Sequence, residues 1–153
     1  LYMKDGSMYK GNWIDNKFCG INNVFIDSNG IAYKGNFING ILEGIGNRFT
    51  IENHSYTGNF VHFKREGQGE ENFGECIYKG EYKDDKINGE GEIIFNSGDS
   101  YKGQFLNGVF HGEGHYIWKN KSEYIGSYVN GKFHGHGIYI ANQNEYYKGK
   151  GVR

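Results

Sequence analysis

Histidine and cysteine are the side chains of this sequence that could bind a metal ion. His111 and His134 stand 23 residues apart, His136 follows closely, and the two cysteines are Cys19 and Cys76. A zinc site requires three or four such ligands at about 2.0–2.3 Å from one ion. The 23-residue spacing is the period of a repeat, so equivalent histidines lie about 10 Å apart and converge poorly within one chain. We therefore expect surface histidines and no metal; the alternative is an ion shared between two chains, with a cysteine as a soft ligand.

Pairs of glycines one residue apart, such as Gly44/Gly46 and Gly112/Gly114, could in principle cradle a phosphate. A phosphate loop also needs a Gly-Lys-Ser/Thr ending and a helix that opens after it, and neither pattern follows these glycines. Serine, histidine and acidic residues are likewise not arranged as a catalytic relay. The sequence therefore predicts a protein that is not an enzyme and that binds no cofactor.

Lysines form the third group with possible chemistry. Lysine follows a recurring tyrosine at five places: Lys10, Lys34, Lys79, Lys102 and Lys148. All five are expected on one face of a sheet, where they could clamp lipid phosphates. Glutamates share that face and cancel most of the attraction, so a solvated surface is the alternative. The net charge of −1 gives no field that would attract nucleic acid.

The structural elements that position these side chains can be inferred from a repeat, in which a tyrosine recurs every 22 to 24 residues. The recurring tyrosines are Tyr9, Tyr33, Tyr56, Tyr78, Tyr101, Tyr124 and Tyr147. Each is followed by a glycine two positions later. The first six are also followed by another aromatic residue four positions later. A fixed period of this length indicates stacked units, each of which finds its core only against its neighbours. We expect one array over residues 1–153, with units that begin at 9, 33, 56, 78, 101 and 124 and a partial unit at 147.

Each unit has the pattern of one β-hairpin. Residues 101–105 alternate with period 2, Asn107-Gly108 forms a tight turn, and residues 112–118 return along the same face. A ring can lie flat over a bare cross-strand glycine, which explains the glycines on the aromatic face. The predicted fold is all-β: an elongated, twisted, single antiparallel meander of about six to seven stacked hairpins, with an aromatic-lined groove and almost no helix.

Composition favours a folded cytoplasmic protein. Aromatics make up 17% of the residues and supply buried area despite the low share of aliphatics. Two cysteines at unrelated repeat positions favour a reducing compartment, and no apolar run reaches the roughly 20 residues of a membrane span. Abundant Asn, Lys and Ile are typical of AT-rich genomes, such as those of some protozoa. The repeat is cut at both ends, so we expect a fragment of a longer array whose open sheet edges recruit another strand or chain.

The string Tyr-x-Gly-x-(Trp/Phe/Tyr)-x-x-Gly-x-x-x-Gly-x-Gly recurs along essentially the whole chain and resembles the MORN repeat (membrane occupation and recognition nexus). The resemblance implies an elongated sheet of hairpins with non-catalytic roles: scaffolding, homodimerisation, binding of partner helices or peptides, and phosphoinositide binding. It also implies kinship with MORN scaffolds in protozoan cytoskeletal and cell-division structures. Three units depart from the pattern, the fourth by Asp84-Asp85 at its turn. The first has Asn22 for its last glycine, and the third has Phe63 where the hairpin glycine should be.

Three residues stand out as candidate partner contacts. Arg48 and Glu71 interrupt an otherwise apolar row on the ring-bearing face, which also holds Val24, Ile93, Tyr116 and Tyr139. At about 10 Å apart, the two charges either pair with each other or form a polar notch that fixes the register of a bound helix or peptide. Phe63 is either tucked against the next unit or an exposed anchor for a partner.

These patterns favour a non-enzymatic interaction scaffold that is cytoplasmic and associated with the cytoskeleton or a membrane. Its groove would present rings to a partner helix or peptide: Tyr56, Tyr78, Tyr101, Phe105, Tyr116, Trp118, Tyr124 and Tyr128. Two copies would pair through the terminal hairpin from Tyr124 to Gly149. The alternatives are a module that binds phosphoinositides or membrane surfaces, and a regulatory MORN segment of a larger enzyme.

Overall fold

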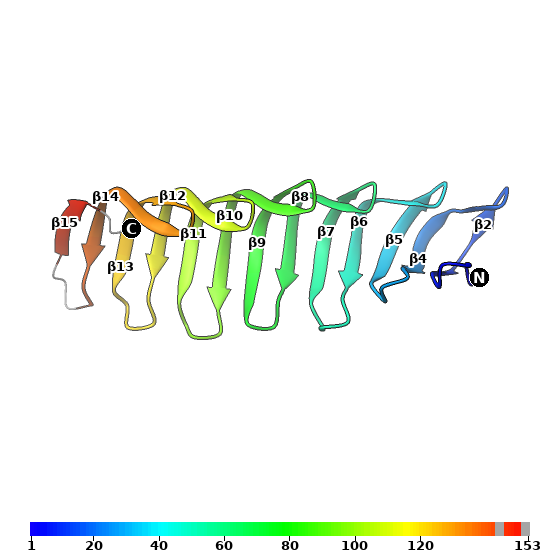
Figure 1. The fold of residues 1–153 in the computed structure, drawn as a ribbon, viewed down its shortest axis with the longest axis horizontal. Coiled ribbons are helices and arrows are strands. Elements are labelled where there is room, and N and C mark those ends of the chain that lie inside the picture. Colours follow the sequence, from blue (N-terminus) through cyan, green and yellow to red (C-terminus); the bar gives the residue numbers. More distant parts are fainter. Residues whose placement is uncertain (143–145, 151–153) are drawn as a thin grey trace.

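The protein is a row of hairpins that lie side by side, seen in a computed structural model that describes residues 1–142 and 146–150 (Figure 1). In this described part of the chain, thirteen strands form one antiparallel sheet in chain order, and two short strands form a second sheet. The first unit has four strands: β1 (Met8–Lys10), β2 (Trp13–Ile14), β3 (Lys17–Phe18) and β4 (Gly20–Ile26). Each later unit has two: β5 (Ala32–Ile38), β6 (Ile41–Phe49), β7 (Ser55–Val61), β8 (Lys64–Asn72), β9 (Cys76–Lys83), β10 (Lys86–Phe95), β11 (Ser100–Leu106), β12 (Val109–Ile117), β13 (Glu123–Val129) and β14 (Lys132–Ile140). The last strand, β15 (Tyr146–Lys150), lies at one edge of the main sheet, and β1 lies at the other.

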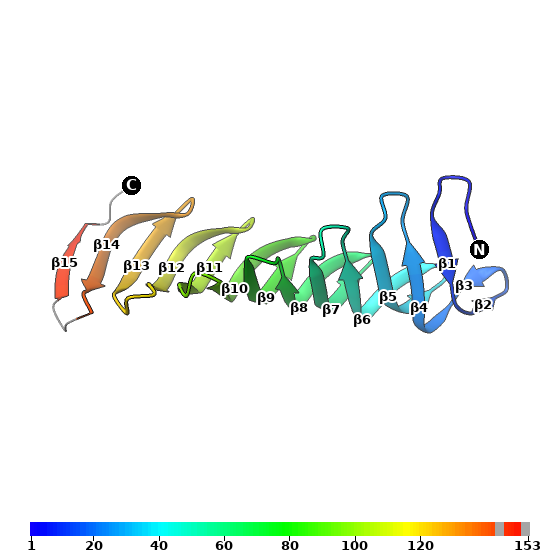
Figure 2. The same ribbon diagram turned by 90° about the horizontal axis from the view of Figure 1, so that it is seen from below.

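The predicted all-β meander is confirmed. Every neighbouring pair in the main sheet is antiparallel, and consecutive strands pair from β4 to β15. The sheet twists along its length (Figure 2). The described residues contain no helix, and therefore none that is long and apolar enough to cross a membrane.

Each hairpin closes with a two-residue turn in the left-handed region. Asn39 and Gly40 have φ angles of 51° and 84°, and the other Asn-Gly turns share this geometry. Turns of this type match the twist of the flanking strands, which is why Asn-Gly predicts them. The turns His62-Phe63 and Asp84-Asp85 adopt the same shape without a glycine, with φ between 49° and 69°.

The two glycines of each pair have different roles. Gly112 has φ of 76° and lies where the register of β11 and β12 shifts, so it forms a bulge. Gly114 has Gly103 directly across the ladder, and a Cβ there would collide with the ring and hydroxyl of Tyr101. The predicted contact between ring and bare glycine is thus confirmed. It recurs as Tyr56 with Gly69, Tyr78 with Gly91, and Tyr124 with Gly137.

The hydroxyl of the recurring tyrosine also has a fixed partner. Tyr101 donates it to the carbonyl oxygen of Gln104 at 2.8 Å, within the stretch where the register shifts. The same bond joins Tyr56 to Asn59, Tyr78 to Glu81 and Tyr124 to Ser127. This bond explains why the position holds tyrosine rather than phenylalanine in these units.

The core is a continuous series of rings on one side of the sheet, which we call the ring face. Tyr56 meets Phe60 and Tyr82 edge-on at centroid distances of 5.1 and 5.0 Å. Tyr78 meets Tyr82 and Phe105 in the same way, at 5.4 and 5.2 Å. Because each ring touches rings of its own and of a neighbouring unit, the units share one core.

The hairpin tips bend over the ring face along one edge of the row (Figure 1). The second turn residue donates its N–H to a carbonyl of the preceding unit, as Gly108 does to Ile87 at 2.9 Å and Gly131 to Phe110 at 2.9 Å. The accepting residues stand two positions after a turn, and we call them the post-turn row: Phe18, Leu42, Arg65, Ile87 and Phe110, with Phe133 at the equivalent place in the last hairpin.

The first unit corrects two details of the predicted register. Asn23, not Asn22, takes the place of the second glycine, since it pairs with Gly35. Its buried side chain accepts a hydrogen bond from the N–H of Asn12 and donates one to the carbonyl of Cys19, and β2 and β3 form their own small sheet. The first unit is also one residue longer, which shifts its member of the row that contains Arg48 and Glu71. Phe25, rather than Val24, takes that place, since it pairs with Tyr33.

Candidate protein-interaction surface

Six of the eight rings predicted to face a partner are core residues instead. Each is at most 5% exposed: Tyr56, Tyr78, Tyr101, Phe105, Tyr124 and Tyr128. The folded hairpin tips and the neighbouring rings cover them, so they offer no surface to a partner. The repeat pattern predicts the turns but not the direction in which the tips bend, and that direction decides the exposure.

The other two rings, Tyr116 and Trp118, are half-buried and belong to a cluster with Phe133 and Tyr139, which we call the aromatic strip. Trp118 lies 4.9 Å from Tyr116, 6.1 Å from Phe133 and 5.9 Å from Tyr139, between ring centroids. Tyr139 is 39% exposed. The Tyr116 hydroxyl donates to Asp99 at 2.7 Å, and burial together with Asp99 raises the pKa of Tyr116 to about 12. The strip is therefore apolar, held in place and open to solvent.

Glu71 forms an ion pair with Arg65 rather than with Arg48. Arg48 and Glu71 do flank Tyr56 in the ladder, as predicted. The carboxylate of Glu71, however, is buried and accepts a hydrogen bond from the Arg65 guanidinium on the same strand. Arg48 is only half-buried, beside Tyr33, so it alone of the predicted pair can face a partner. The alternative of a mutual Arg48–Glu71 pair is corrected accordingly.

Asp85 and Tyr82 complete the charge cluster around Arg65. Arg65 donates from Nε to Oδ1 of Asp85 at 2.7 Å and from Nη2 to the Asp85 carbonyl at 2.6 Å. Tyr82 donates its hydroxyl to Oε1 of Glu71 at 2.7 Å, and its ring lies 5.1 Å from the Arg65 guanidinium. Burial lowers the pKa of Arg65, but Asp85 and Glu71 raise it by more, so the guanidinium stays charged. Burial and Glu71 raise the pKa of Tyr82. This cluster is a satisfied part of the core.

Phe63 is tucked, but against the preceding units rather than the next one. Its ring lies 5.4 Å from Phe25, 5.3 Å from Tyr33 and 5.8 Å from Phe37, between centroids. The tip that carries Phe63 is tied back by the hydrogen bond from its N–H to the carbonyl of Leu42. The side chain therefore fills the ring face over the second unit.

A pocket of about 480 Å³ lies on the ring face over the fourth unit, and we call it the ring-face pocket. Ile87, Ile93, Gly108, Phe73 and Cys76 line it. Glu75 and His54 also line it. Burial, with Glu75 and Glu71, raises the pKa of the Cys76 thiol, so the pocket holds a neutral thiol and is mostly apolar.

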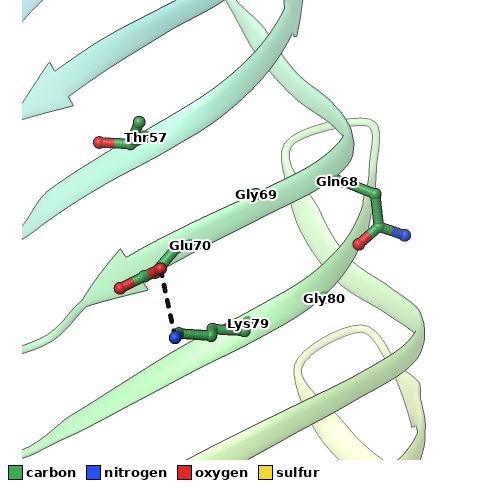
Figure 3. A pocket seen from close by; sticks show the side chains of 6 residues that line it. All are labelled: Thr57, Gln68, Gly69, Glu70, Lys79 and Gly80. Atoms are coloured by element: carbon green, nitrogen blue, oxygen red, sulfur yellow. Dashed lines mark ion pairs between the residues drawn. The ribbon is translucent and has the colours of Figure 1, made fainter.

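The opposite face of the sheet carries the predicted lysine row among acidic residues. Lys10, Lys34, Lys79 and Lys102 are exposed, and Lys148 lies outside the residues whose side chains the structure describes. Lys79 is within 3.7 Å of Glu70 beside a shallow hollow of about 410 Å³ (Figure 3). Paired charges of this kind do not attract phosphate strongly.

The three histidines predicted as weak metal candidates, His111, His134 and His136, do not gather with other ligands. No group of three or more His, Cys, Asp or Glu side chains suited to a metal occurs among the described residues. His111 has a buried Nδ1 without a hydrogen-bond partner within the described part of the chain. A metal shared between two chains stays a prediction.

The residues that sequence reasoning missed are Arg65 and Asp85. The signal was present, because Arg65 interrupts a post-turn row that is otherwise apolar, and Asp85 takes the place of a turn glycine. Arg65 belongs to the third unit and Asp85 to the tip of the fourth, and each tip contacts the unit before it. Aligning the units on their turns, rather than on their tyrosines, would have paired them.

Repeated hairpins that share one core define a tandem-repeat array. The family model of the MORN repeat matches residues 9–21, 33–48, 78–100, 101–123 and 124–144. These segments make up more than half of the chain, which therefore belongs to the MORN repeat family, a non-catalytic repeat. The unmatched third unit is the one that carries Phe63, Arg65 and Glu71.

Comparison with solved structures finds similarity to the TCP domain of SAS-4 (dCPAP) from Drosophila melanogaster, in complex with a proline-rich motif of Ana2 (dSTIL). The identity is 11%, the TM-score is 0.47, and the match covers 98% of this chain and 81% of that chain. A likeness at this level does not establish a shared function. No curated protein sequence matches the chain.

Proposed function

We propose that this chain is a non-enzymatic scaffold that binds a helix or an extended peptide of a partner protein along its ring face. The observation that carries the proposal is the aromatic strip, in which Tyr116 and Trp118 remain partly exposed beside Tyr139. Half-buried aromatic side chains combine large apolar area with little loss of side-chain entropy on binding, and they are frequent hot spots of interfaces.

The rigidity of the array supports the same function. Among the residues whose side chains the structure describes, eleven buried aromatic or aliphatic side chains form one cluster along the sheet, from Phe18 to Tyr128. A surface that is already ordered loses little conformational entropy when a partner docks. The long row of hairpins therefore suits a protein whose role is to hold other chains in a fixed arrangement.

Homodimerisation and cellular location form the finer part of the proposal. Two copies would pair through the C-terminal hairpin from Tyr124 to Gly149, where β15 is the outer strand of this sheet. The two free cysteines are consistent with a cytoplasmic protein, and we propose a cytoskeletal or membrane-associated assembly as its place. Light scattering tests the dimer, since a single chain has a mass of 17.4 kDa.

Capture of partners with matched surface variants tests the scaffold function. Tyr139→Ser removes an exposed ring of the aromatic strip, and Ile94→Ser removes a side chain of similar exposure from the opposite face. We expect a partner protein, identified by mass spectrometry and reproduced with purified material, to bind the wild type and Ile94→Ser and to be lost by Tyr139→Ser. Equal retention by all three proteins would contradict binding along the ring face.

A further inference from the structure

Most units fill the space above their recurring tyrosine with a side chain of the chain itself. Phe110 stacks on Tyr101 at a centroid distance of 3.9 Å, and Phe133 stacks on Tyr124 at 4.1 Å. Both stacking residues belong to the post-turn row.

The second and third units fill the same space by other means. Phe63, at the tip of the following unit, packs on Tyr33 at 5.3 Å. The guanidinium of Arg65 lies 5.9 Å from the ring of Tyr56. A large planar group therefore covers the tyrosine in four units.

The fourth unit has no large planar group at this place, although its recurring tyrosine, Tyr78, is fully buried. Its post-turn residue is Ile87, which is smaller than a ring, and the tip that bends over it ends in Gly108, which has no side chain. A Cβ built on Gly108 would meet no atom within 4 Å. The ring-face pocket of about 480 Å³ is lined by Ile87, Ile93 and Gly108, and Tyr78 is not among the described residues that line it. Its volume is within the range of about 300–1,000 Å³ that is usual for ligand sites.

From this comparison we infer that the ring-face pocket receives an aromatic or similarly large apolar side chain of the partner, which takes the place that Phe63 holds over the second unit. The inference rests on the proposed function. It adds which part of the partner enters the ring face, and at which place. The internal residue Phe63 shows the shape and polarity of the missing group, since it occupies the equivalent turn position to Gly108.

The charge around the pocket indicates which residues of the partner should flank that side chain. Glu75 is exposed and, among the described residues, is the only formally charged one that lines the pocket, apart from the titratable His54 and Cys76. The preceding loop contributes Glu52, which is also exposed, and neither loop, 50–54 or 73–75, contains Lys or Arg. A partner segment with lysine or arginine next to its apolar anchor therefore complements this rim.

Two variants close the pocket by different means. Gly108→Phe adds a ring at the turn, as Phe63 does in the third unit, and Ile87→Phe adds a ring to the post-turn row, as Phe110 does in the fifth. The control is Gly131→Phe, which makes the same change in a turn of the same geometry, with φ of 82° against 83° and open space around the Cβ. Ile87→Phe places no side chain at a positive φ, so it tests the pocket even where Gly108→Phe impairs folding.

A phage-displayed library of random 12-residue peptides, selected on the wild-type chain, is the probe. We expect enrichment of peptides with a Phe, Tyr, Trp or Leu anchor beside Lys or Arg. Their binding should weaken at least about tenfold, or by about 1.4 kcal/mol, in both pocket variants and not in Gly131→Phe. Peptides that lack this signature, or that bind the pocket variants unchanged, would overturn the pocket and leave the scaffold function standing. Selection of no peptide at all would count against both.

Discussion

Arg65 and Asp85 stand twenty residues apart and meet where the tip of the fourth unit bends over the third, with Nε of Arg65 2.7 Å from Oδ1 of Asp85. Arg65 also holds the buried carboxylate of Glu71. One guanidinium thus compensates two acids, one of them inside the core. The other units place apolar residues such as Leu42 or Phe110 at the position of Arg65, so the third unit has exchanged an apolar contact for a buried ionic one.

This relationship predicts that Arg65→Leu strongly destabilises the protein. The variant would leave Glu71 buried without a cation, and loss of one partner of a buried pair costs about 3–5 kcal/mol. Urea denaturation followed by circular dichroism measures the change in the free energy of unfolding.

The double variant Arg65→Leu/Glu71→Ile gives the matched control. It restores the residue types of Leu42 and Ile93 at the equivalent positions. Because replacement of a buried pair by apolar residues is often neutral, we expect it to recover most of the loss. A double variant as unstable as the single one would show that Glu71 has a role beyond pairing with Arg65.

The fold could be predicted from the sequence because the residues that determine it act locally. Asn-Gly at 39–40 specifies a turn through its own φ angles, and the alternation from Tyr101 to Phe105 specifies a strand. Stacking of units follows from the repeat period, since no single hairpin can bury its rings. These local signals predicted the order of the strands and the contact of a ring with a bare glycine on the neighbouring strand.

The site was predicted less well because exposure depends on contacts between units. Tyr101 and Tyr116 have the same residue type and lie on the same face, yet the first is buried and the second half-exposed. The difference comes from the tips, which bend back over the preceding unit. Likewise, the repeat alignment places Arg48 and Glu71 in adjacent units and so suggests either a mutual pair or a polar notch. In the structure Glu71 pairs with Arg65, which also holds the tip residue Asp85 of the next unit.

Gly114→Ala should cost much more stability than Gly131→Ala. The Cβ of the first variant would overlap the ring and hydroxyl of Tyr101, and overpacking of this kind costs about 1–3 kcal/mol. At Gly131 the Cβ would meet no atom within 4 Å, so only the positive φ of 82° is unfavourable, at about 1 kcal/mol. Thermal unfolding of both variants measures the difference, and equal losses would refute the close contact at Gly114.

Removal of a tyrosine hydroxyl should have opposite effects at two buried positions. Tyr101→Phe deletes the donor to the Gln104 carbonyl and should lower the free energy of unfolding by about 1–2 kcal/mol. The hydroxyl of Tyr128 is buried without a partner among the described residues, so Tyr128→Phe should be neutral or stabilising. The same denaturation experiment compares the two, and a loss at Tyr128 equal to that at Tyr101 would indicate that its hydroxyl is bonded.

Alkaline pH should unfold the array through its buried tyrosines. Burial raises the pKa of Tyr56 and Tyr101 to about 12, above the value of about 10 for an exposed tyrosine. A group whose folded-state pKa is raised stabilises the fold fully below its unfolded pKa, and this contribution is lost as the pH rises through the folded value. Stability should therefore fall between about pH 10 and pH 12, and the absorbance of tyrosinate should rise together with the loss of the β-sheet circular dichroism signal. Complete ionisation of the 13 tyrosines near pH 10 with the sheet intact would show that these rings are accessible to water, contrary to the shared core on which the stacking of the units depends.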